Sequence, residues 1–309
     1  MQIRTDLAME SRDFSGFKNG VSSFVFQHGS IEEIHVNIDT NEAAEALSKS
    51  CGKYITLTHG SLLYSDMNEK KKLSQILAET VESLLPHDGD ILVIGLGNRH
   101  ITADALGSRV LDHLLITRHM KEITDQELRG RLRSVCAVAP GVLGITGIET
   151  AEMVQGIVKK INPAAVIAID ALAARDSSRI CTTIQITDTG ICPGSGVGNH
   201  RIGLTKDTLG IPVIAIGVPM VVYASVIARD ALTKLLDDIG MNAAEHERIM
   251  DELIERVSKQ GMKEMVVTPR EVDELVGKVA RIIARGLNMA LQPALNEDEI
   301  NVISHDGMA

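Results

Sequence analysis

The stretch Ile91-Leu-Val-Ile-Gly-Leu-Gly-Asn98 decides the fold class of this chain of 309 residues. Its apolar, β-branched run predicts a short strand buried on both faces, and the two glycines predict a tight turn at its end. A second run, Ala165-Val-Ile-Ala-Ile-Asp170, has the same character. Strands of this kind belong to parallel sheets that are covered by helices on both faces.

Buried strands and helices alternate on either side of this stretch. Strands are expected near Val135, Val166 and Val213, and helices over about 69–85, 103–117 and 149–160. Such alternation implies right-handed parallel crossovers. We therefore expect an α/β fold with a mostly parallel sheet between helical layers.

The two ends of the chain differ from this body. All four phenylalanines lie between Phe14 and Phe26, and the alternation in residues 23–27 and 34–38 predicts a small N-terminal unit of antiparallel strands with its own layer. The C-terminal part, about 221–290, is expected to be helical. Its apolar stripes begin at Ile249 and at Val272 and predict packing on the sheet or on a neighbouring subunit.

Composition excludes several classes of partner. The formal net charge of −10 argues against direct nucleic-acid binding, because that affinity depends on many lysine and arginine contacts to phosphates. No apolar run is long enough for a membrane span, and the four cysteines lack CxxC spacing. These features predict a protein of a reducing, cytoplasmic compartment.

Two acidic residues follow the two decisive strands. Asp104 lies just beyond the first strand, and Asp170 closes the second. Ligands bind at the carboxyl ends of parallel strands, so both carboxylates are expected in one crevice. Asp170 ends a wholly apolar strand, where an acid must be paired or functional. Asp104 and Asp170 are thus a candidate acid/base pair, against the alternative of a helix cap and a loop anchor.

Other motifs carry weaker signals. Asp188-Thr-Gly190 resembles an aspartic-protease loop, but such proteases need two copies, so a turn is favoured. His100 or His200 would complete a metal site with the two acids, and a divalent metal is therefore a possible cofactor that the sequence does not settle. Two glycine-rich loops suit a groove for an extended peptide. The glycines concerned are Gly141, Gly144, Gly194 and Gly196.

Several ordered blocks together resemble the germination protease family of endospore-forming bacteria. The resemblance runs from about Arg4 to Pro219 and rests on Gly95-Leu-Gly-Asn98, Ile101-Thr-Ala-Asp-Ala-Leu-Gly107, Ala139-Pro-Gly-Val-Leu-Gly-Ile-Thr-Gly-Ile-Glu149, Ile167-Ala-Ile-Asp-Ala-Leu-Ala-Ala-Arg175, Thr182-Thr-Ile-Gln-Ile-Thr-Asp-Thr-Gly190, Pro193-Gly-Ser-Gly-Val-Gly-Asn199 and Leu209-Gly-Ile-Pro-Val-Ile-Ala-Ile-Gly-Val-Pro219.

This resemblance implies an endopeptidase of the spore core that degrades small acid-soluble spore proteins at germination. It implies cleavage after Glu or Asp and before a hydrophobic residue, a homotetramer, and a zymogen that cleaves itself. It also implies the phosphorylase/hydrolase-like three-layer sandwich of the hydrogenase maturation peptidases. The acids proposed as catalytic in the family match Asp104 and Asp170.

Arg4-Thr-Asp-Leu-Ala8 is similar to the processing site of that family, with the cut between Asp6 and Leu7. Residues 1–6 would then be a pro-segment, and residues 7–309 one catalytic domain. Two alternatives stay open: a metal-assisted peptidase that uses the same acids, and a non-catalytic protein that binds small spore proteins in the glycine-loop groove.

Overall fold

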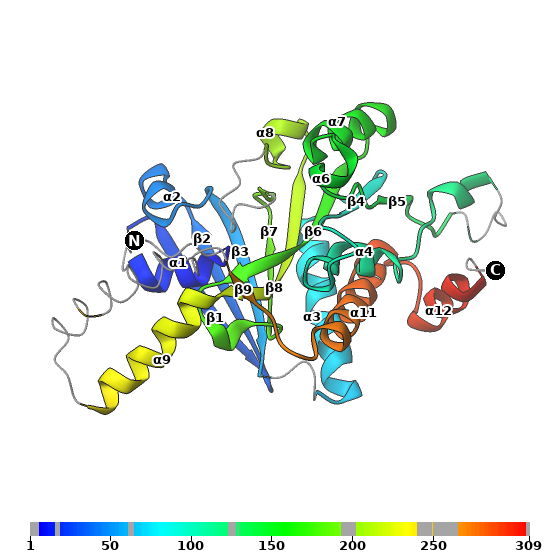
Figure 1. The fold of residues 1–309 in the computed structure, drawn as a ribbon. Coiled ribbons are helices and arrows are strands. Elements are labelled where there is room, and N and C mark those ends of the chain that lie inside the picture. Colours follow the sequence, from blue (N-terminus) through cyan, green and yellow to red (C-terminus); the bar gives the residue numbers. More distant parts are fainter. Residues whose placement is uncertain are drawn as a thin grey trace.

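The computed structural model describes residues 6–15, 19–60, 65–122, 128, 130–192, 202–239, 249 and 265–306. These residues form one nine-stranded sheet in the order β1-β2-β3-β7-β8-β6-β4-β5, with β9 paired to β8 (Figure 1). The strands are β1 (Val21–His28), β2 (Ile31–Ile38), β3 (Gly52–His59), β4 (Ile91–Gly95), β5 (Val135–Val138), β6 (Ala165–Ala174), β7 (Thr183–Thr187), β8 (Val213–Tyr223) and β9 (Val266–Val267).

Helices cover both faces of the sheet, which confirms the predicted α/β class. The α-helices in the described part are α1 (Ala8–Ser15), α2 (Asn41–Leu47), α3 (Met67–Leu84), α4 (Leu106–Leu111), α6 (Leu143–Thr146), α7 (Thr150–Ile161), α8 (Lys206–Leu209), α9 (Ala224–Asp238), α11 (Val272–Leu291) and α12 (Glu297–Asp306). Short 3-10 helices are η1 (Thr102–Asp104), η2 (Arg118–Glu122) and η3 (Ser177–Arg179). None of the helices among these residues is long and apolar enough to span a bilayer.

The core is divided by the two faces of the sheet. Helices α3, α4 and α11 lie side by side against one face (Figure 1). On the opposite face, α7 covers the β4–β6 part of the sheet, whereas α1 and α2 cover its β2–β3 part. Strand β6 runs under both of these opposite-face clusters, because Val166 belongs to the first and Leu172 to the second.

The sheet is mixed rather than mostly parallel. Strands β5, β4, β6 and β8 run parallel to one another, as expected. Strands β1, β2, β3 and β7 join this part through antiparallel pairs, and β7 also pairs antiparallel with β8. The expectation therefore holds for only one half of the sheet. The N-terminal strands extend this same sheet and do not form a layer of their own.

Helix boundaries differ from the sequence expectation in two places. The helix expected over 103–117 is split into η1 and the short α4, because the chain first turns back to bring Asp104 toward Asn98. The first glycine loop contains the one-turn helix α6. The C-terminal stripe from Val272 is buried on the sheet as part of α11, whereas the stripe from Ile249 lies outside the described residues apart from Ile249 itself.

Candidate active site

Asp170 lies where β6 passes from one apolar cluster to the next. Side chains alternate along a strand, so Asp170 shares its face with Ala168 and Leu172. Those two residues belong to the α7 cluster and to the α1–α2 cluster respectively. The Asp170 side chain is buried, and its Oδ1 accepts a hydrogen bond from the Ala171 N–H at 2.9 Å.

The turn after β4 positions Asp104. Gly97 has a φ of +92°, and a Cβ added there would stand 2.0 Å from the Asp104 carbonyl oxygen. Only glycine permits this approach of the two backbones. The Asp104 Oδ2 accepts a hydrogen bond from the Asn98 N–H at 2.8 Å, so this carboxylate closes the turn. The predicted tight turn is therefore present.

The surroundings of Asp170 favour its protonated form. Burial raises the pKa of its carboxyl well above the ordinary value, and the negative charges of Asp104 and Asp6 raise it further. The hydrogen bond from the Ala171 N–H opposes this increase. Two nearby carboxyl groups therefore differ in environment, which is the condition for one of them to hold a proton while the other is ionised.

Both acids line one cavity of about 870 Å³. It lies on the face of β6 where the two opposite-face clusters meet, and α2, β7 and the loop after β5 also contribute to its wall. The residues on which the argument depends are Asp6, Lys49, Asp104, Gly141, Asp170 and Gln185. Lys49 is the one cationic side chain among the described residues that line the cavity.

The N-terminal segment lies in this cavity. The Asp6 N–H donates to the Ala173 carbonyl at 3.3 Å, and the Ala173 N–H donates to the Asp6 Oδ2 at 3.0 Å. Leu7 is fully buried in the α1–α2 cluster. The expected processing site, Asp6–Leu7, is thus docked beside the strand that carries Asp170.

Three further contacts hold the peptide unit at Asp6. The Lys49 Nζ and the Gln185 Nε2 both donate to the Asp6 carbonyl oxygen, at 2.9 Å and 3.1 Å. The Gln185 Oε1 accepts from the Ala8 N–H at 2.7 Å. Neither residue belongs to the sequence-based site. The sequence signal for Gln185 is its polar side chain between the apolar Ile184 and Ile186. The structure shows that the strand containing these residues is buried along its length.

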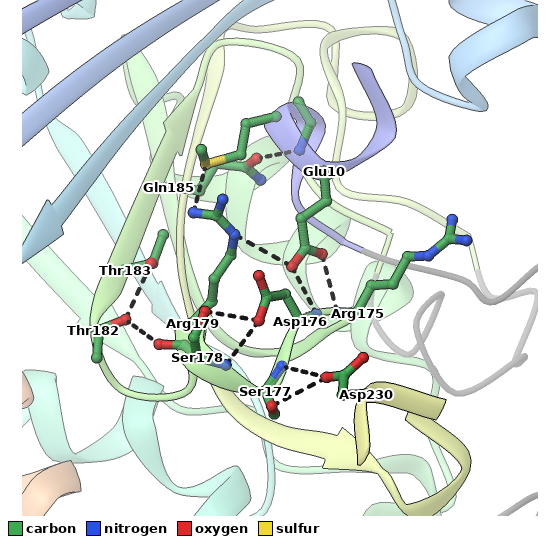
Figure 2. A network of polar contacts seen from close by, with 12 residues as sticks. Glu10, Arg175, Asp176, Ser177, Ser178, Arg179, Thr182, Thr183, Gln185 and Asp230 are labelled. Atoms are coloured by element: carbon green, nitrogen blue, oxygen red, sulfur yellow. Dashed lines mark hydrogen bonds and ion pairs between the residues drawn. The ribbon is translucent and has the colours of Figure 1, made fainter. Parts of the chain in front are cut away.

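Glu10 anchors the segment beyond Leu7 (Figure 2). Its buried carboxylate accepts from the N–H groups of Arg175 and Asp176, each at 3.0 Å, and lies 3.5 Å from the Arg179 Nε. These N–H groups follow the last residue of β6, where the ladder gives them no partner strand. Helix α1 is therefore fixed to the end of β6 through one side chain.

Other residues of the sequence-based site lie elsewhere. Gly141 lines the cavity, whereas Gly144 is exposed on α6 and does not. Asp188 is exposed, and its Oδ1 accepts from the Lys53 N–H at 2.8 Å, in keeping with a role in a turn. His100 is exposed and is not among the cavity-lining residues. Gly194, Gly196 and His200 lie outside the described residues.

The donor set was tested against a metal ion. Asp104 and Asp170 supply two carboxyl groups, and each already accepts a backbone N–H. Within the described residues, no three His, Cys, Asp or Glu side chains gather closely enough to hold a metal ion. The described residues therefore do not form a protein ligand set for a metal ion.

The chain was compared with known proteins. The germination protease family matches residues 4–264 and 245–304. The germination proteases of Caldanaerobacter subterraneus subsp. tengcongensis and Clostridium perfringens are 42% and 41% identical, covering 98% and 97% of this chain and 98% of each relative. That of Bacillus subtilis is 36% identical and covers 98% of this chain and 97% of its own length. The NiFe hydrogenase maturation protease HycI from Thermococcus kodakarensis is 18% identical, with a TM-score of 0.32 over 67% of this chain and 98% of HycI.

The match to a peptidase family model gives the class of this protein, which is a peptidase. The match over nearly the whole chain identifies the family, and the chain belongs to the germination proteases.

Proposed function

We propose that this chain is a spore endopeptidase that uses Asp104 and Asp170 to hydrolyse peptide bonds after Glu or Asp and before a hydrophobic residue. One observation carries the proposal: the chain's own Asp6 lines the same cavity as both acids, and the following residue, Leu7, is fully buried in the adjoining apolar cluster. An acid followed by a buried leucine is the pattern that such an enzyme would bind in a substrate.

The two acids take different roles in the proposed mechanism. Burial and the charge of Asp104 raise the pKa of Asp170, so Asp170 holds the proton and acts as general acid. Asp104 is the base that activates a water molecule. These two roles require carboxyl groups with different pKa values, because one group must hold a proton while the other is ionised.

The contacts of Asp6 and Leu7 account for the proposed specificity. The carboxylate of Asp6 accepts the Ala173 N–H, and the Lys49 ammonium adds favourable charge. The Leu7 side chain fills an apolar site formed with Val36, Tyr54 and Leu172. A neutral residue before the cut would lose the charge-assisted hydrogen bond, and a charged residue after it would lose its solvation.

We infer that the full chain is a zymogen that removes residues 1–6. The docked segment occupies the cavity, and tethering gives it a high effective concentration against any free substrate. Its release opens the same cavity to the proposed substrates, the small acid-soluble proteins of the spore core. We also propose that the protein forms a homotetramer in the cytoplasm of the spore. The names of the relatives, which are germination proteases, support the spore as its location.

Point variants test the acid pair. Asp104→Asn and Asp170→Asn should each abolish conversion of the full chain to a product that begins at Leu7, measured by intact mass. Both should also abolish hydrolysis of a purified small acid-soluble protein by a chain produced to begin at Leu7. Asp188→Asn is the matched control, because Asp188 is exposed and lies outside the cavity.

The outcomes separate the candidate functions. If Asp188→Asn were the only inactivating change, the assignment of the pair would be wrong. If the chain beginning at Leu7, with both acids unaltered, bound the spore protein tightly and left it intact, the chain would be a binding protein and the peptidase proposal would fail.

A further inference from the structure

The carbonyl oxygen of Asp6 receives two side-chain donors at the bond that the proposed function cleaves. Lys49 Nζ lies 2.9 Å from this oxygen and Gln185 Nε2 lies 3.1 Å from it. Both side chains line the cavity together with Asp104 and Asp170. Other contacts of the segment are made to its N–H groups, to the carboxylates of Asp6 and Glu10, and to apolar side chains.

We propose that Lys49 and Gln185 are catalytic residues that stabilise the oxyanion formed on the substrate carbonyl during peptide-bond hydrolysis. The inference rests on the proposed function and adds the electrophilic half of the site to the acid pair. Donors fixed in advance around a developing oxyanion are worth more in a water-poor cavity than in solution.

The orientation of the Gln185 amide is fixed by its two contacts. Its Oε1 accepts the Ala8 N–H at 2.7 Å, so its Nε2 must face the Asp6 carbonyl. One amide therefore reads the main chain on both sides of the Asp6–Leu7 bond. This contact does not depend on the side chains of a substrate, which suits an enzyme that must act on the backbone of several related proteins.

Both donors are placed by regular structure. Gln185 is buried in the middle of β7, between hydrogen-bonded neighbours on β3 and β8. Lys49 follows the C-terminus of α2, where its N–H donates to the Ala44 carbonyl at 3.0 Å. Rigid support matters because an oxyanion site that must reorganise during the reaction loses most of its effect.

The charge on Lys49 is set by opposing influences. Burial lowers the pKa of its ammonium group, and the carboxylates of Asp6 and Glu10 act in the opposite direction. In the ammonium form, Nζ brings a positive charge to the oxygen on which negative charge develops. Gln185 contributes a neutral donor to the same atom.

In the proposed reaction, one water molecule is added across the Asp6–Leu7 peptide bond. Water adds its oxygen to the Asp6 carbonyl carbon, and one water proton passes to the Asp104 carboxylate. The C=O π electrons move to the oxygen, which Lys49 and Gln185 stabilise. When the tetrahedral intermediate collapses, the C–N bond breaks and the Leu7 nitrogen takes the Asp170 proton. The products are a carboxyl group at Asp6 and an amine at Leu7, and proton transfer between the acids restores the pair.

Self-cleavage of the full chain provides the test. The rate of conversion to a product beginning at Leu7 is measured by intact mass for the unaltered protein, Lys49→Met, Lys49→Arg and Gln185→Glu. Lys49→Met keeps the methylene stem and loses the donor. Gln185→Glu keeps the acceptor for the Ala8 N–H and loses the donor toward Asp6. We expect each of these two variants to slow cleavage by about 10²-fold, the usual effect of losing one oxyanion donor, and Lys49→Arg to recover part of the rate.

Controls separate loss of chemistry from loss of structure. Lys53→Met and Gln75→Glu alter exposed residues outside the cavity and should leave the rate unchanged. Hydrogen exchange at the Ala8 N–H in Lys49→Met reports whether the segment is still docked. A slow variant with a protected Ala8 N–H supports an effect on the chemical step, whereas one with an unprotected N–H assigns Lys49 to docking and overturns its catalytic role.

The measured rates distinguish failure of the oxyanion assignment from failure of the proposed peptidase function. If the unaltered chain self-cleaves, Asp170→Asn does not, and Lys49→Met and Gln185→Glu both cleave at the normal rate, the oxyanion assignment is wrong and the acid pair stands. If the unaltered chain does not cleave between Asp6 and Leu7 at all, both are overturned.

Discussion

Asp170 is a buried acid. The groups that act on its pKa are Asp104, Asp6 and the Ala171 N–H, and none of these is a positively charged side chain. Such a group lowers the stability of the folded protein, and groups of this kind are concentrated in active sites. The two acids were accessible to sequence reasoning because each follows a run of apolar residues that predicts a buried strand. The expectation that Asp170 closes its strand is wrong, because β6 continues past Asp170 to Ala174. The catalytic role of the two acids stays a prediction.

The first prediction concerns the stability of Asp170→Asn. The folded-state pKa of Asp170 is raised above the ordinary 3.8, so the unfolded chain ionises more readily and stability falls as the pH rises above about 4. Asparagine has no such titration. The variant should therefore be more stable than the unaltered protein at pH 7, by a margin that grows as the pH rises from about 4. Denaturant unfolding at pH 4 to 8 measures this, and a difference independent of pH would contradict it.

The second prediction concerns Gly97. An alanine there meets the Asp104 carbonyl at 2.0 Å and must adopt a φ of +92°. Gly97→Ala should destabilise the fold by about 2 kcal/mol or more and displace Asp104, with loss of hydrolysis. Gly144→Ala is the matched control, because nothing lies within 4 Å of its Cβ position, and it should be neutral. Thermal unfolding and an activity assay decide; equal effects of the two changes would refute the argument.

Lys49 and Gln185 show what sequence reasoning lacked at this scale. Gln185 reaches the cavity because β7 pairs with both β3 and β8, and Lys49 reaches it because α2 packs beside the N-terminal segment. Neither residue follows a strand end, so the rule that found the two acids does not extend to them. Gln185 could be noticed as a polar residue in an apolar strand. Nothing near Lys49 in the sequence indicates that it contacts the Asp6 carbonyl oxygen.

At the scale of elements, the parallel half of the sheet and the antiparallel N-terminal strands were predictable, but their union in one sheet through β7 was not. Strand β6 ends at Ala174 and β7 begins at Thr183. That connection is shorter than the dozen or so residues a parallel crossover needs, so β7 runs antiparallel to β6. The alternation in β1 and β2 correctly indicated a hairpin, but it gave no information on whether the hairpin joined the main sheet.

The third prediction concerns the attachment of α1. Glu10 satisfies the N–H groups of Arg175 and Asp176 with a buried carboxylate. Glu10→Ala leaves both without this acceptor, so the segment should detach at a cost of about 2 kcal/mol or more. We expect slower self-cleavage and faster hydrogen exchange over α1. Glu42→Ala, an exposed change on α2, should alter neither. Unchanged exchange in Glu10→Ala would disprove the anchoring role.

At the scale of the whole molecule, the exposed apolar side chains indicate which surface is expected to contact another subunit. The stripe on α11 is buried within its own chain. On β1, which has β2 as its one neighbour in the sheet order, Phe24, Val25 and Phe26 are 54%, 59% and 48% exposed. Among the described residues, β1 therefore presents an exposed apolar surface that suits a subunit contact, whereas the α11 stripe does not.

The fourth prediction follows from this surface. Light scattering at micromolar concentration should give a mass several times 33.3 kDa, the mass of one chain. The double change Phe24→Ser and Phe26→Ser should shift that mass toward one chain, because it removes exposed apolar area without touching the core. A single-chain mass for the unaltered protein would rule out the assembly.

The fifth prediction concerns metal dependence. The proposed mechanism uses side chains of the protein and no metal ion, so prolonged dialysis against a chelator should leave kcat/KM unchanged for a chain beginning at Leu7. Activity that disappeared on dialysis and returned with one divalent cation would favour the metal-assisted alternative. Elemental analysis of the active protein, run in parallel, identifies any ion concerned.

The placement of Asp6 in the cavity of its own chain has a kinetic consequence. Lys49, Gln185 and Ala173 reach this segment within a single chain, so no second molecule has to be met before the first bond is broken. Activation should therefore proceed with the same half-time in a dilute solution as in a concentrated one, and keeping the molecules apart would not delay it.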